Sequence, residues 1–416
     1  MPLSTRSIAI LALAVGATTT TTTTNTSTAQ SRALSAATTL QTWYNSATGI
    51  WNTCGWWNGA NCMTTLANLA ALDFNTSNSN DDDGKAAFNA TALAVFQNTF
   101  AVATNANPYP AIGANPANYT SANGTAYHGS GESVPTGAAN ASLWLDGSYD
   151  DDAWWALAWI AAYDVTGNDD YLDLAEGIFY HLSNAWPSKC GNGGIDSSST
   201  HVYVGAIANE LFLALAAQLA NRVSHNNSSS YYLDWAERQW TWFKDSGLIN
   251  ENHTINDGLT NDCKNNGATL WTYNQGVILG GLVELDRAVA AKNSSSSSSK
   301  NSTYLDAAGK IAAGAIEALT DDDHVLHESC EPDSCGAADQ TQFKGIFVRN
   351  LKALQGVAPS DTYAKVINAS ADSLWAHDRT DANGFGVDWS GPVDAATVNA
   401  STQSSAMDAL VAAIWE

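Results

Sequence analysis

The amino-acid sequence predicts an all-α fold in which an inner and an outer ring of helices form one domain over residues 30–416. A run that is apolar on nearly every face, such as LFLALAA at residues 211–217, must be buried on all sides. Such runs precede a helix start that recurs at Tyr171, Tyr232, Tyr304 and, more weakly, Tyr363. One hairpin of this kind cannot bury its own faces, whereas a closed array of hairpins can. Strand-like alternation is scarce, in agreement with an all-α fold.

The apolar helices are expected at residues 153–166, 206–222, 273–290 and 345–355, and each is followed by an amphipathic partner. Further helices are expected at residues 32–45, 64–74, 85–104 and 402–415, which completes about six hairpins. Long loops are expected before inner helices, at residues 106–149, 188–202, 249–269 and 321–341. Loops of this length in a compact domain are usually functional. In a ring of hairpins these loops would gather at the same end.

The N-terminal segment indicates export from the cell. Arg6 precedes a short apolar run at residues 8–17, and small residues follow, as in a secretory signal. The run is too short to cross a membrane as a helix. The threonine tract at residues 18–24 has no means of packing, so residues 1–29 are expected to be a removed or disordered segment. The chain ends without the apolar tail that signals a glycolipid anchor.

The charge and the cysteine content of the chain limit which ligands and which cellular compartment are plausible. The net charge of -24 and the pI near 4.4 would repel phosphates, which argues against nucleic acid and anionic membranes. A monomer without a cofactor is expected. Cysteine usage fits an oxidising compartment, and the positions favour the pairs Cys54–Cys62, Cys190–Cys263 and Cys330–Cys335, with other pairings open. Sequons indicate surface glycans at Asn75, Asn89, Asn118, Asn123, Asn140, Asn252, Asn301, Asn368 and Asn399.

The most informative motif is YDDDAWW at residues 149–155, where a loop becomes an apolar helix. Cleavage of a glycosidic bond needs two carboxyl groups, one to protonate the leaving oxygen and one to attack carbon or activate water. Neighbouring helical residues diverge by about 100°, so two of the three aspartates could reach opposite sides of one sugar. Close carboxylates also raise one another's pKa, as a general acid requires. The alternative is that the aspartates only cap the helix.

Polar side chains also occupy the starts of other predicted inner helices, where burial is costly unless they are paired. They could form a polar floor for sugar hydroxyls, or they could pair between hairpins, as Glu210 with Arg349. The candidate substrate ligands are Asp152, Trp155, Asn209, Glu210, Asp257, Tyr273, Asn274, Gln275, Lys344 and Arg349. No metal is expected. His324, His327 and Glu328 lack the arrangement of a zinc site, and the acidic runs at residues 81–83 and 321–323 lack EF-hand spacing.

These motifs resemble glycoside hydrolase family 76, the fungal and bacterial endo-α-1,6-mannanases. The resemblance covers most of the mature chain and rests on YDDDAWWALA at residues 149–158, NELFLAL at 209–215, TYNQGV at 272–277 and FKGIFVR at 343–349. It implies an (α/α)6 barrel and retaining hydrolysis by two consecutive aspartates, the first as nucleophile and the second as acid/base. Alignment on the second tryptophan places these roles at Asp150 and Asp151. A slip of one residue would place them at Asp151 and Asp152.

The resemblance implies α-1,6-mannan or a mannooligosaccharide as substrate and a secreted protein, extracellular or in the cell wall. Some fungal relatives carry a glycolipid anchor, and the missing anchor signal makes this chain more similar to a secreted, mannan-degrading form. Two alternatives stay open. One is a transglycosylase that moves mannan-linked chains between acceptors. The other is a non-catalytic cell-wall protein that binds carbohydrate at the same place.

Overall fold

The computed structural model describes residues 19–74, 79–109, 140–223, 228–293, 302–332, 335 and 339–415. Most of the proposed secretory signal lies outside the described residues, as does most of the predicted loop at 106–149. Among the helices that are described, none combines the length and the apolar character needed to cross a bilayer.

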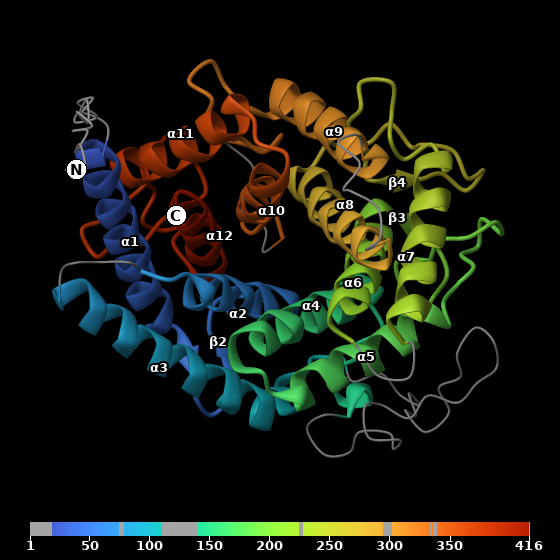
Figure 1. The fold of residues 1–416 in the computed structure, drawn as a ribbon, viewed down its shortest axis with the longest axis horizontal. Helices are drawn as coiled ribbons and strands as arrows, with labels where there is room; N and C mark the ends of the chain where they lie inside the picture. The colour runs from blue at the N-terminus through green and yellow to red at the C-terminus, as the bar shows by residue number, and fades with distance from the viewer. Residues whose placement is uncertain are drawn as a thin grey trace, which may run out of the picture.

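Helices of the described chain form two concentric rings (Figure 1). The inner ring consists of α2 (Trp56–Ala71), α4 (Tyr149–Thr166), α6 (Ala206–Arg222), α8 (Thr272–Lys292), α10 (Phe343–Val357) and α12 (Ala400–Ala412). The outer ring consists of α1 (Thr19–Gln41), α3 (Ser79–Val102), α5 (Asp169–Ser183), α7 (Ser228–Asp245), α9 (Thr303–Leu319) and α11 (Asp361–His377). Each inner helix packs against the next, and α12 returns to α2. The predicted (α/α)6 barrel is confirmed.

The ring is closed by the two ends of the chain. Each inner helix from α2 to α10 packs against the outer helix that follows it, as the hairpin repeat predicts. The sixth pair joins α12 to α1, so the last inner helix packs against the first helix of the chain (Figure 1). In the described residues, the loops at 184–203, 246–257 and 378–399 each lead from an outer helix toward the next inner helix, and so they lie at the same end of the barrel, which we call the rim. Short strands pair in these connections: β1 (Tyr44–Asn45) pairs with β2 (Ile50–Trp51) within the connection before α2. The pairing of β3 (Val204–Gly205) with β4 (Gly258–Leu259) links the loop before α6 to the loop before α8.

Two predicted boundaries were wrong. Helix α2 begins at Trp56 and not near residue 64, because Asn58 and Asn61 are completely buried and hydrogen-bonded inside a helix. The Asn61 amide donates to Trp57 O at 3.2 Å and accepts from Arg349 at 2.6 Å, which removes the cost of burying it. The backbone is also helical from Thr19, within the threonine tract, because a helix that is already nucleated extends at little cost.

Trp155 belongs to the core and not to a sugar-binding surface. Its side chain is completely buried, with ring centroids 4.7 Å from Trp56, 4.9 Å from Trp144 and 6.3 Å from Trp159. Aromatic rings at these separations pack favourably in apolar surroundings. The prediction of Trp155 as a substrate ligand is therefore corrected. The neighbouring Trp154 was correctly expected to be in the core, with 3% of its surface exposed.

The structure forms two of the three expected disulfides, Cys190–Cys263 and Cys330–Cys335. Cys54 and Cys62 are free thiols in this structure, so the third expected pair is not formed. Burial, and then hydrogen bonding to Cys54, raise the pKa of the Cys62 thiol well above its usual value. Two of the sequon residues have local structural roles. Asn140 accepts a hydrogen bond from Ser142 N, and Asn399 accepts from the first turn of α12.

Close approach of two inner helices depends on Gly276. A Cβ atom there would lie 2.5 Å from the Cα of Phe347 and 3.0 Å from the carbonyl oxygen of Ile346, so α8 and α10 could not keep their separation. We expect Gly276→Ala to lower the free energy of unfolding by about 1–3 kcal/mol, because overpacking forces backbone shifts. Chemical denaturation measures this change. Gly356→Ala is the control, since nothing lies within 4 Å of its added methyl group and it should be neutral or stabilising by up to about 1 kcal/mol. Equal effects at both positions would contradict the proposed close packing.

Candidate active site

The aspartate motif forms the first turn of α4 at the rim. Ser148 precedes the helix, and the backbone N–H of Tyr149 donates to the carbonyl of Ser197 at 2.9 Å, which joins the helix start to the loop before α6. The three aspartates differ in exposure. Asp150 and Asp151 are partly accessible, whereas Asp152 has no exposed surface. Only the first two can meet a ligand at the rim.

The fourth residue of an inner helix recurrently holds the loop before it. Asn209 in α6 accepts from Ile195 N at 2.8 Å and donates to Ile195 O at 2.9 Å. Gln275 in α8 makes the same pair of bonds with Ile255, both at 2.8 Å. Gln403 in α12 accepts from Phe385 N at 3.0 Å. These side chains are completely buried and satisfy backbone groups that have no water nearby.

Asp152 is the fourth residue of α4 and acts in the same way. Its Oδ1 accepts from the backbone N–H of Asp146 at 2.9 Å, inside the loop that precedes the helix. We call Asp152, Asn209, Gln275 and Gln403 the loop-binding side chains. The interpretation of Asp152, Asn209 and Gln275 as substrate ligands is therefore corrected, because Asp152 Oδ1 and the amides of Asn209 and Gln275 bind loop backbone and none of the three side chains has accessible surface. The second oxygen of Asp152 makes no hydrogen bond to the described residues and lies 3.8 Å from His181 Nε2.

Asp150 and Asp151 differ in their electrostatic surroundings. Burial raises the pKa of Asp150 to about 6, with further repulsion from Asp146 and Asp339, while backbone N–H groups at the helix start favour its ionised form. Burial also raises the pKa of Asp151 well above its usual value, and here Asp150 and Asp146 repel its charge and Asp146 accepts a hydrogen bond from its protonated form. These surroundings favour ionisation of Asp150 over that of Asp151.

Asp146 is held in position by its own turn. Its carboxylate accepts from Ser148 N at 2.8 Å, while its N–H is bonded to Asp152. This Asx turn directs the carboxylate back toward the first turn of α4. Asp146 was not among the sequence candidates. The Asp-Gly-Ser turn at residues 146–148 was the signal available for it.

Tyr273, the second residue of α8, lies among several acidic groups. Burial raises the pKa of its phenol well above the usual value, and Asp150, Asp257, Glu210 and Asp339 raise it further. Those carboxylates and Asp150 therefore share one neighbourhood at the rim. Asp257 is half-buried and accepts from the hydroxyl of Tyr203, which also accepts from the Asn266 amide at 3.0 Å. The structure thus brings the predicted residues Asp257, Glu210 and Tyr273 to the side of Asp150.

Aromatic rings from several inner helices surround this acidic group. Tyr273 stacks on Phe343 at a centroid distance of 3.8 Å, and Phe343 contacts Trp271 at 5.5 Å and Trp57 at 6.2 Å. The Trp57 indole N–H donates to Asp339 at 3.0 Å. Trp57, Trp271 and Tyr273 remain partly accessible. Partly accessible rings beside carboxylates can stack against the apolar face of a sugar.

Glu210 and Asn274 are the unusual members of the predicted set. Both are completely buried, and none of their side-chain oxygen or nitrogen atoms hydrogen-bonds to the described residues. Burial alone raises the pKa of Glu210 well above its usual value, which favours the neutral acid. Buried polar groups normally have partners, so these two side chains have unused hydrogen-bonding capacity, although neither has accessible surface in this structure. The pairing of Glu210 with Arg349 considered from the sequence is not formed.

Lys344 is committed to a charge network at another part of the rim. Its ammonium is ion-paired with Glu331, donates to Val387 O at 2.6 Å and lies 4.5 Å from the centroid of the Trp389 ring. Only 2% of the residue is exposed. The interpretation of Lys344 as a sugar ligand is therefore corrected, because its positive charge stabilises buried Glu331.

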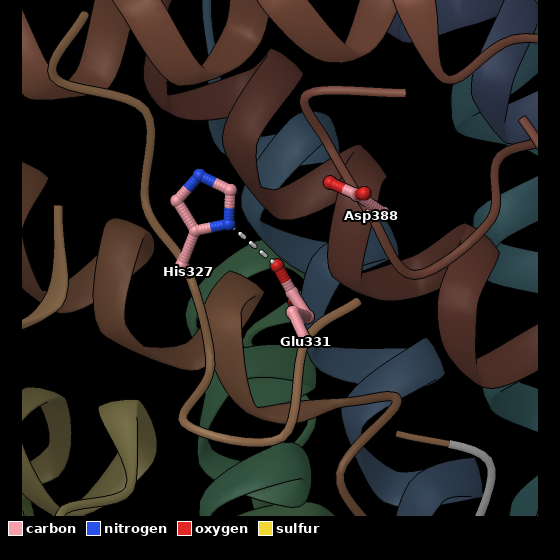
Figure 2. A group of neighbouring side chains, drawn as sticks. All are labelled: His327, Glu331 and Asp388. Atoms are coloured by element: carbon pink, nitrogen blue, oxygen red, sulfur yellow. Dashed lines mark hydrogen bonds and ion pairs between the residues drawn. The ribbon is translucent and has the colours of Figure 1, made fainter. Parts of the chain in front are cut away.

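Figure 2 shows the potential metal ligands of the same network, in which His327 faces Glu331 and Asp388 approaches from another loop. Their ligand atoms lie within 4.8 Å of one another, and no other such group occurs in the described part of the chain. His327 Nδ1 is 2.9 Å from Glu331 and Nε2 is 3.1 Å from Asp321, so both ring nitrogens have carboxylate partners. The Lys344 ammonium already balances Glu331. The absence of a metal stays a prediction.

Arg349 lies deeper in the barrel than the rim. It is ion-paired with Asp408 at 2.9 Å and donates to Asn61 at 2.6 Å. It also lines a cavity of about 370 Å³ enclosed by the C-terminal halves of the inner helices, together with Arg222 and Glu284. The interpretation of Arg349 as a substrate ligand is corrected, because it is the seventh residue of α10 and its guanidinium group is already bound to Asp408 and Asn61.

We expect Asp152→Asn to fold and to retain activity, because burial keeps the Asp152 carboxyl neutral and an asparagine oxygen can still accept from Asp146 N. The raised pKa in the folded state means that folded wild type holds a proton which the unfolded chain releases above about pH 4. The free energy of unfolding of the wild type therefore falls as pH rises from the pKa of Asp152 in the unfolded chain to its higher pKa in the folded protein. This one group lowers it by at most about 1.4 kcal/mol per pH unit. Denaturation of both proteins between pH 5 and 8 measures the difference.

The Asp152→Asn variant should lack this contribution and gain stability over wild type as pH increases. Asp170→Asn, at an exposed helix start in α5, controls for a general change of charge. A parallel pH dependence in wild type and in Asp152→Asn would show that Asp152 is charged in the folded protein. Loss of activity at unchanged stability would return Asp152 to the catalytic group.

Solved structures with the same fold include an alpha-1,6-mannanase, GH76A of Salegentibacter sp. HEL1_6. It has 18% sequence identity and a TM-score of 0.64, and the match covers 92% of this chain and 98% of that one. A variant of that mannanase with two aspartates replaced by asparagine, described as inactive, was solved with alpha-1,6-mannotriose. Dfg5 from Chaetomium thermophilum, solved with glucosamine, has 18% identity and a TM-score of 0.68 over 93% of this chain and 90% of that one.

Similar curated proteins are fungal. A putative mannan endo-1,6-alpha-mannosidase of Schizosaccharomyces pombe is 28% identical over 54% of this chain and 51% of its own length. The mannan endo-1,6-alpha-mannosidase DCW1 of Candida albicans is 29% identical over 50% of this chain and 47% of its own. The chain thus spans about half the length of the curated relatives it matches. The family model described as Glycosyl hydrolase family 76 matches residues 27–416, and the chain belongs to this family.

Proposed function

We propose that the protein hydrolyses internal bonds of α-1,6-linked mannan by a retaining double displacement. The observation that carries this proposal is the pair of partly accessible aspartates at the rim whose surroundings separate their protonation states. A retaining glycosidase needs one ionised and one protonated carboxyl group at the start of the reaction. Family membership supports the reaction class, and the names of the relatives support the substrate.

In the proposed first step, the Asp150 carboxylate attacks the anomeric carbon while Asp151 transfers its proton to the glycosidic oxygen. The bond to the leaving sugar breaks, and a glycosyl ester forms on Asp150. In the second step, the Asp151 carboxylate takes a proton from water, whose oxygen attacks the anomeric carbon and releases Asp150. Asp151 is then protonated again. The related mannanase is described as inactive when two of its aspartates are replaced, which supports a pair of aspartates as the reacting groups in that protein.

The substrate contacts follow from the residues beside Asp150. We assign Tyr273 and Asp257 to the hydroxyl groups of the sugar, and we assign the partly accessible rings of Trp57 and Trp271 to stacking. Glu210 and Asn274 supply unpaired polar atoms beneath Tyr273. Aromatic surface with a few placed polar groups is the usual composition of a sugar or small-molecule site.

The proposal extends to location and organisation. Residues 1–29 would be the secretory and threonine-rich segment, and residues 30–416 would form a single catalytic domain that acts as a monomer. The disulfides Cys190–Cys263 and Cys330–Cys335 fit a protein that folds in an oxidising compartment. We place the protein outside the cell or in the cell wall, where α-1,6-mannan is accessible.

Transglycosylation shares the glycosyl-aspartate intermediate and differs only in the acceptor that replaces water. The glucosamine complex of the Dfg5 relative shows that such an amino sugar can occupy that protein. Product analysis with α-1,6-mannotetraose and a high concentration of an acceptor sugar separates the two reactions. Release of reducing ends in proportion to cleavage supports hydrolysis, and longer products without new reducing ends support transfer.

We expect Asp151→Asn to lower the rate of mannan hydrolysis by about 10²–10⁴-fold, because the leaving oxygen would depart unprotonated. Asp150→Asn should cause a loss at least as large, because no glycosyl ester can form. The measurement is the rate of release of reducing ends from α-1,6-mannan. An aryl α-1,6-mannobioside whose leaving group is an acidic phenol separates the nucleophile from the acid. The phenolate leaves without being protonated, so Asp151→Asn should still release one equivalent of phenol per enzyme molecule, whereas Asp150→Asn should not.

The matched control is a double variant that carries both Asp169→Asn and Asp170→Asn. These two aspartates are exposed and start the outer helix α5. This control should keep wild-type activity. Proton NMR of the first sugar released by wild type should show the α anomer. An initial β anomer would exclude double displacement, and wild-type activity in Asp151→Asn would exclude the site.

The pH dependence of kcat/KM should be bell-shaped, because activity needs Asp150 ionised and Asp151 protonated. Activity should rise as pH passes about 6, where Asp150 ionises, and fall at higher pH as Asp151 loses its proton. Asp146→Asn removes a negative charge and a hydrogen-bond acceptor from Asp151, so the descending limb should move to lower pH. A uniform loss of activity with unchanged limbs would indicate that Asp146 has only a structural role.

A further inference from the structure

An open groove of about 450 Å³ lies on the outer wall of the barrel, away from the aspartate motif. It is formed by α7 and by the loop that leads from α5 toward α6. Two half-buried tryptophans, Trp186 and Trp242, line it together with polar side chains that are mostly exposed: Asn192, Glu237, Arg238, Thr241 and Asp245. The proposed catalytic mechanism uses none of these residues.

The groove wall is rigid. Ser188 accepts from Cys190 N, donates its hydroxyl to Gly193 O at 2.8 Å and donates its N–H to Gly194 O at 2.7 Å, which closes a tight turn. The disulfide Cys190–Cys263 fastens this turn to the loop before α8. Because the wall is rigid, the protein loses little conformational entropy when a ligand binds. Even a shallow groove can therefore hold a ligand.

The tryptophans are held by the same turn. A Cβ atom at Gly194 would lie 2.4 Å from the six-membered ring of Trp242, so the backbone can approach that ring only because residue 194 is glycine with φ +69°. Trp186 meets Trp242 edge to face, with centroids 6.4 Å apart. The two indoles therefore have fixed orientations, whereas two free surface tryptophans would change rotamers.

The chemistry of the lining selects a neutral, hydroxyl-rich ligand. Indole surface matches the apolar face of a sugar ring, and amide, hydroxyl, carboxylate and guanidinium groups match its hydroxyls. Glu237 and the net charge of -24 disfavour an anionic ligand. Arg238 is held 4.6 Å from the centroid of the Trp235 ring, so its charge is already engaged.

The groove and the candidate active site are joined by one loop. Trp186 and Asn192 lie at the start of this loop, and Ser197 near its middle accepts from Tyr149 N, directly before Asp150. An isolated antiparallel β-bridge between Ser198 and Ser148 also holds the loop against the start of α4. A polysaccharide chain that followed this loop from the groove would arrive at the start of α4.

We propose that this groove is a second binding site for the mannan chain, which holds the polymer while another segment of it reaches Asp150 and Asp151. The inference rests on the proposed function for its ligand. Binding at two places on one polymer raises apparent affinity through effective concentration, without changing the chemistry. A short oligosaccharide cannot occupy both places and gains nothing from the groove.

The test compares kcat/KM for linear α-1,6-mannan with kcat/KM for α-1,6-mannotetraose. Trp242→Ala removes a ring from the groove, and Thr241→Arg fills the groove from an exposed helical position without removing a packed side chain. Both variants should lower kcat/KM on the polymer at least about tenfold and leave the tetraose unchanged. Trp375→Ala is the control, since Trp375 is also a half-buried tryptophan on an outer helix with Arg379 over its ring at 4.2 Å. It should change neither value.

Equal losses on the two substrates would mean that the variants only damage the fold, and unchanged values on both would overturn the second site. Binding without turnover is measured separately, by retention of Asp151→Asn on immobilised mannan. Adding Thr241→Arg to this variant should weaken retention, and unchanged retention would overturn the proposal. If the wild type cleaves neither substrate, the proposed function is wrong. The groove is still supported as a mannan-binding site in that case if Thr241→Arg, introduced into the wild type, weakens retention of the protein on immobilised mannan.

Discussion

The hydrogen bonds between the fourth residue of an inner helix and the loop before it hold the rim together. Each rim loop carries backbone groups that are buried under its neighbours and cannot reach water. Asn209 and Gln275 satisfy both the N–H and the carbonyl of a buried isoleucine, and Asp152 satisfies the N–H of Asp146. Such groups are expensive to leave unpaired. These bonds fix the loops before α4, α6, α8 and α12, and the rim residues on those loops depend on them for their positions.

The division of roles among the three aspartates follows from this arrangement. Because the fourth helical position points toward the preceding loop, Asp152 is buried and occupied. Asp150 and Asp151 precede it by one or two residues and so emerge at the rim, near Tyr273 and Asp146. Crowding of carboxyl groups in partly buried surroundings then separates the protonation states of two neighbouring residues of the same type. The same physical cause, low access to water, raises the pKa of all three aspartates, but only Asp150 and Asp151 keep accessible surface at the rim.

The barrel has two ends with different electrostatic organisation. At the rim, carboxylates outnumber cations around Asp150, and the nearby Lys344 is held by Glu331. Deeper inside, Arg349 and Arg222 are paired with Asp408, Asp164 and Glu284 and line an internal cavity. Paired charges in the interior stabilise the ring, because removing either partner would leave a buried charge. Acidic groups without paired cations remain at the rim, where they can take part in proton transfer.

By itself, the sequence determined the double ring, the order of its hairpins and the place of the aspartate motif, because these follow from local periodicity and from where apolar runs begin. It also identified the cysteines of the two disulfides that are formed. Only the tertiary structure decided which polar residues face a ligand. Asn209 and Glu210 are neighbours in one motif, yet the first binds Ile195 and the second has no partner among the described residues. Asp146 and Asp339 reach the candidate site through a turn and a long loop, and no periodicity reports that contact. The sequence cannot distinguish a polar side chain that hydrogen-bonds to a loop backbone from one that binds substrate, because packing between distant segments decides which partner it meets.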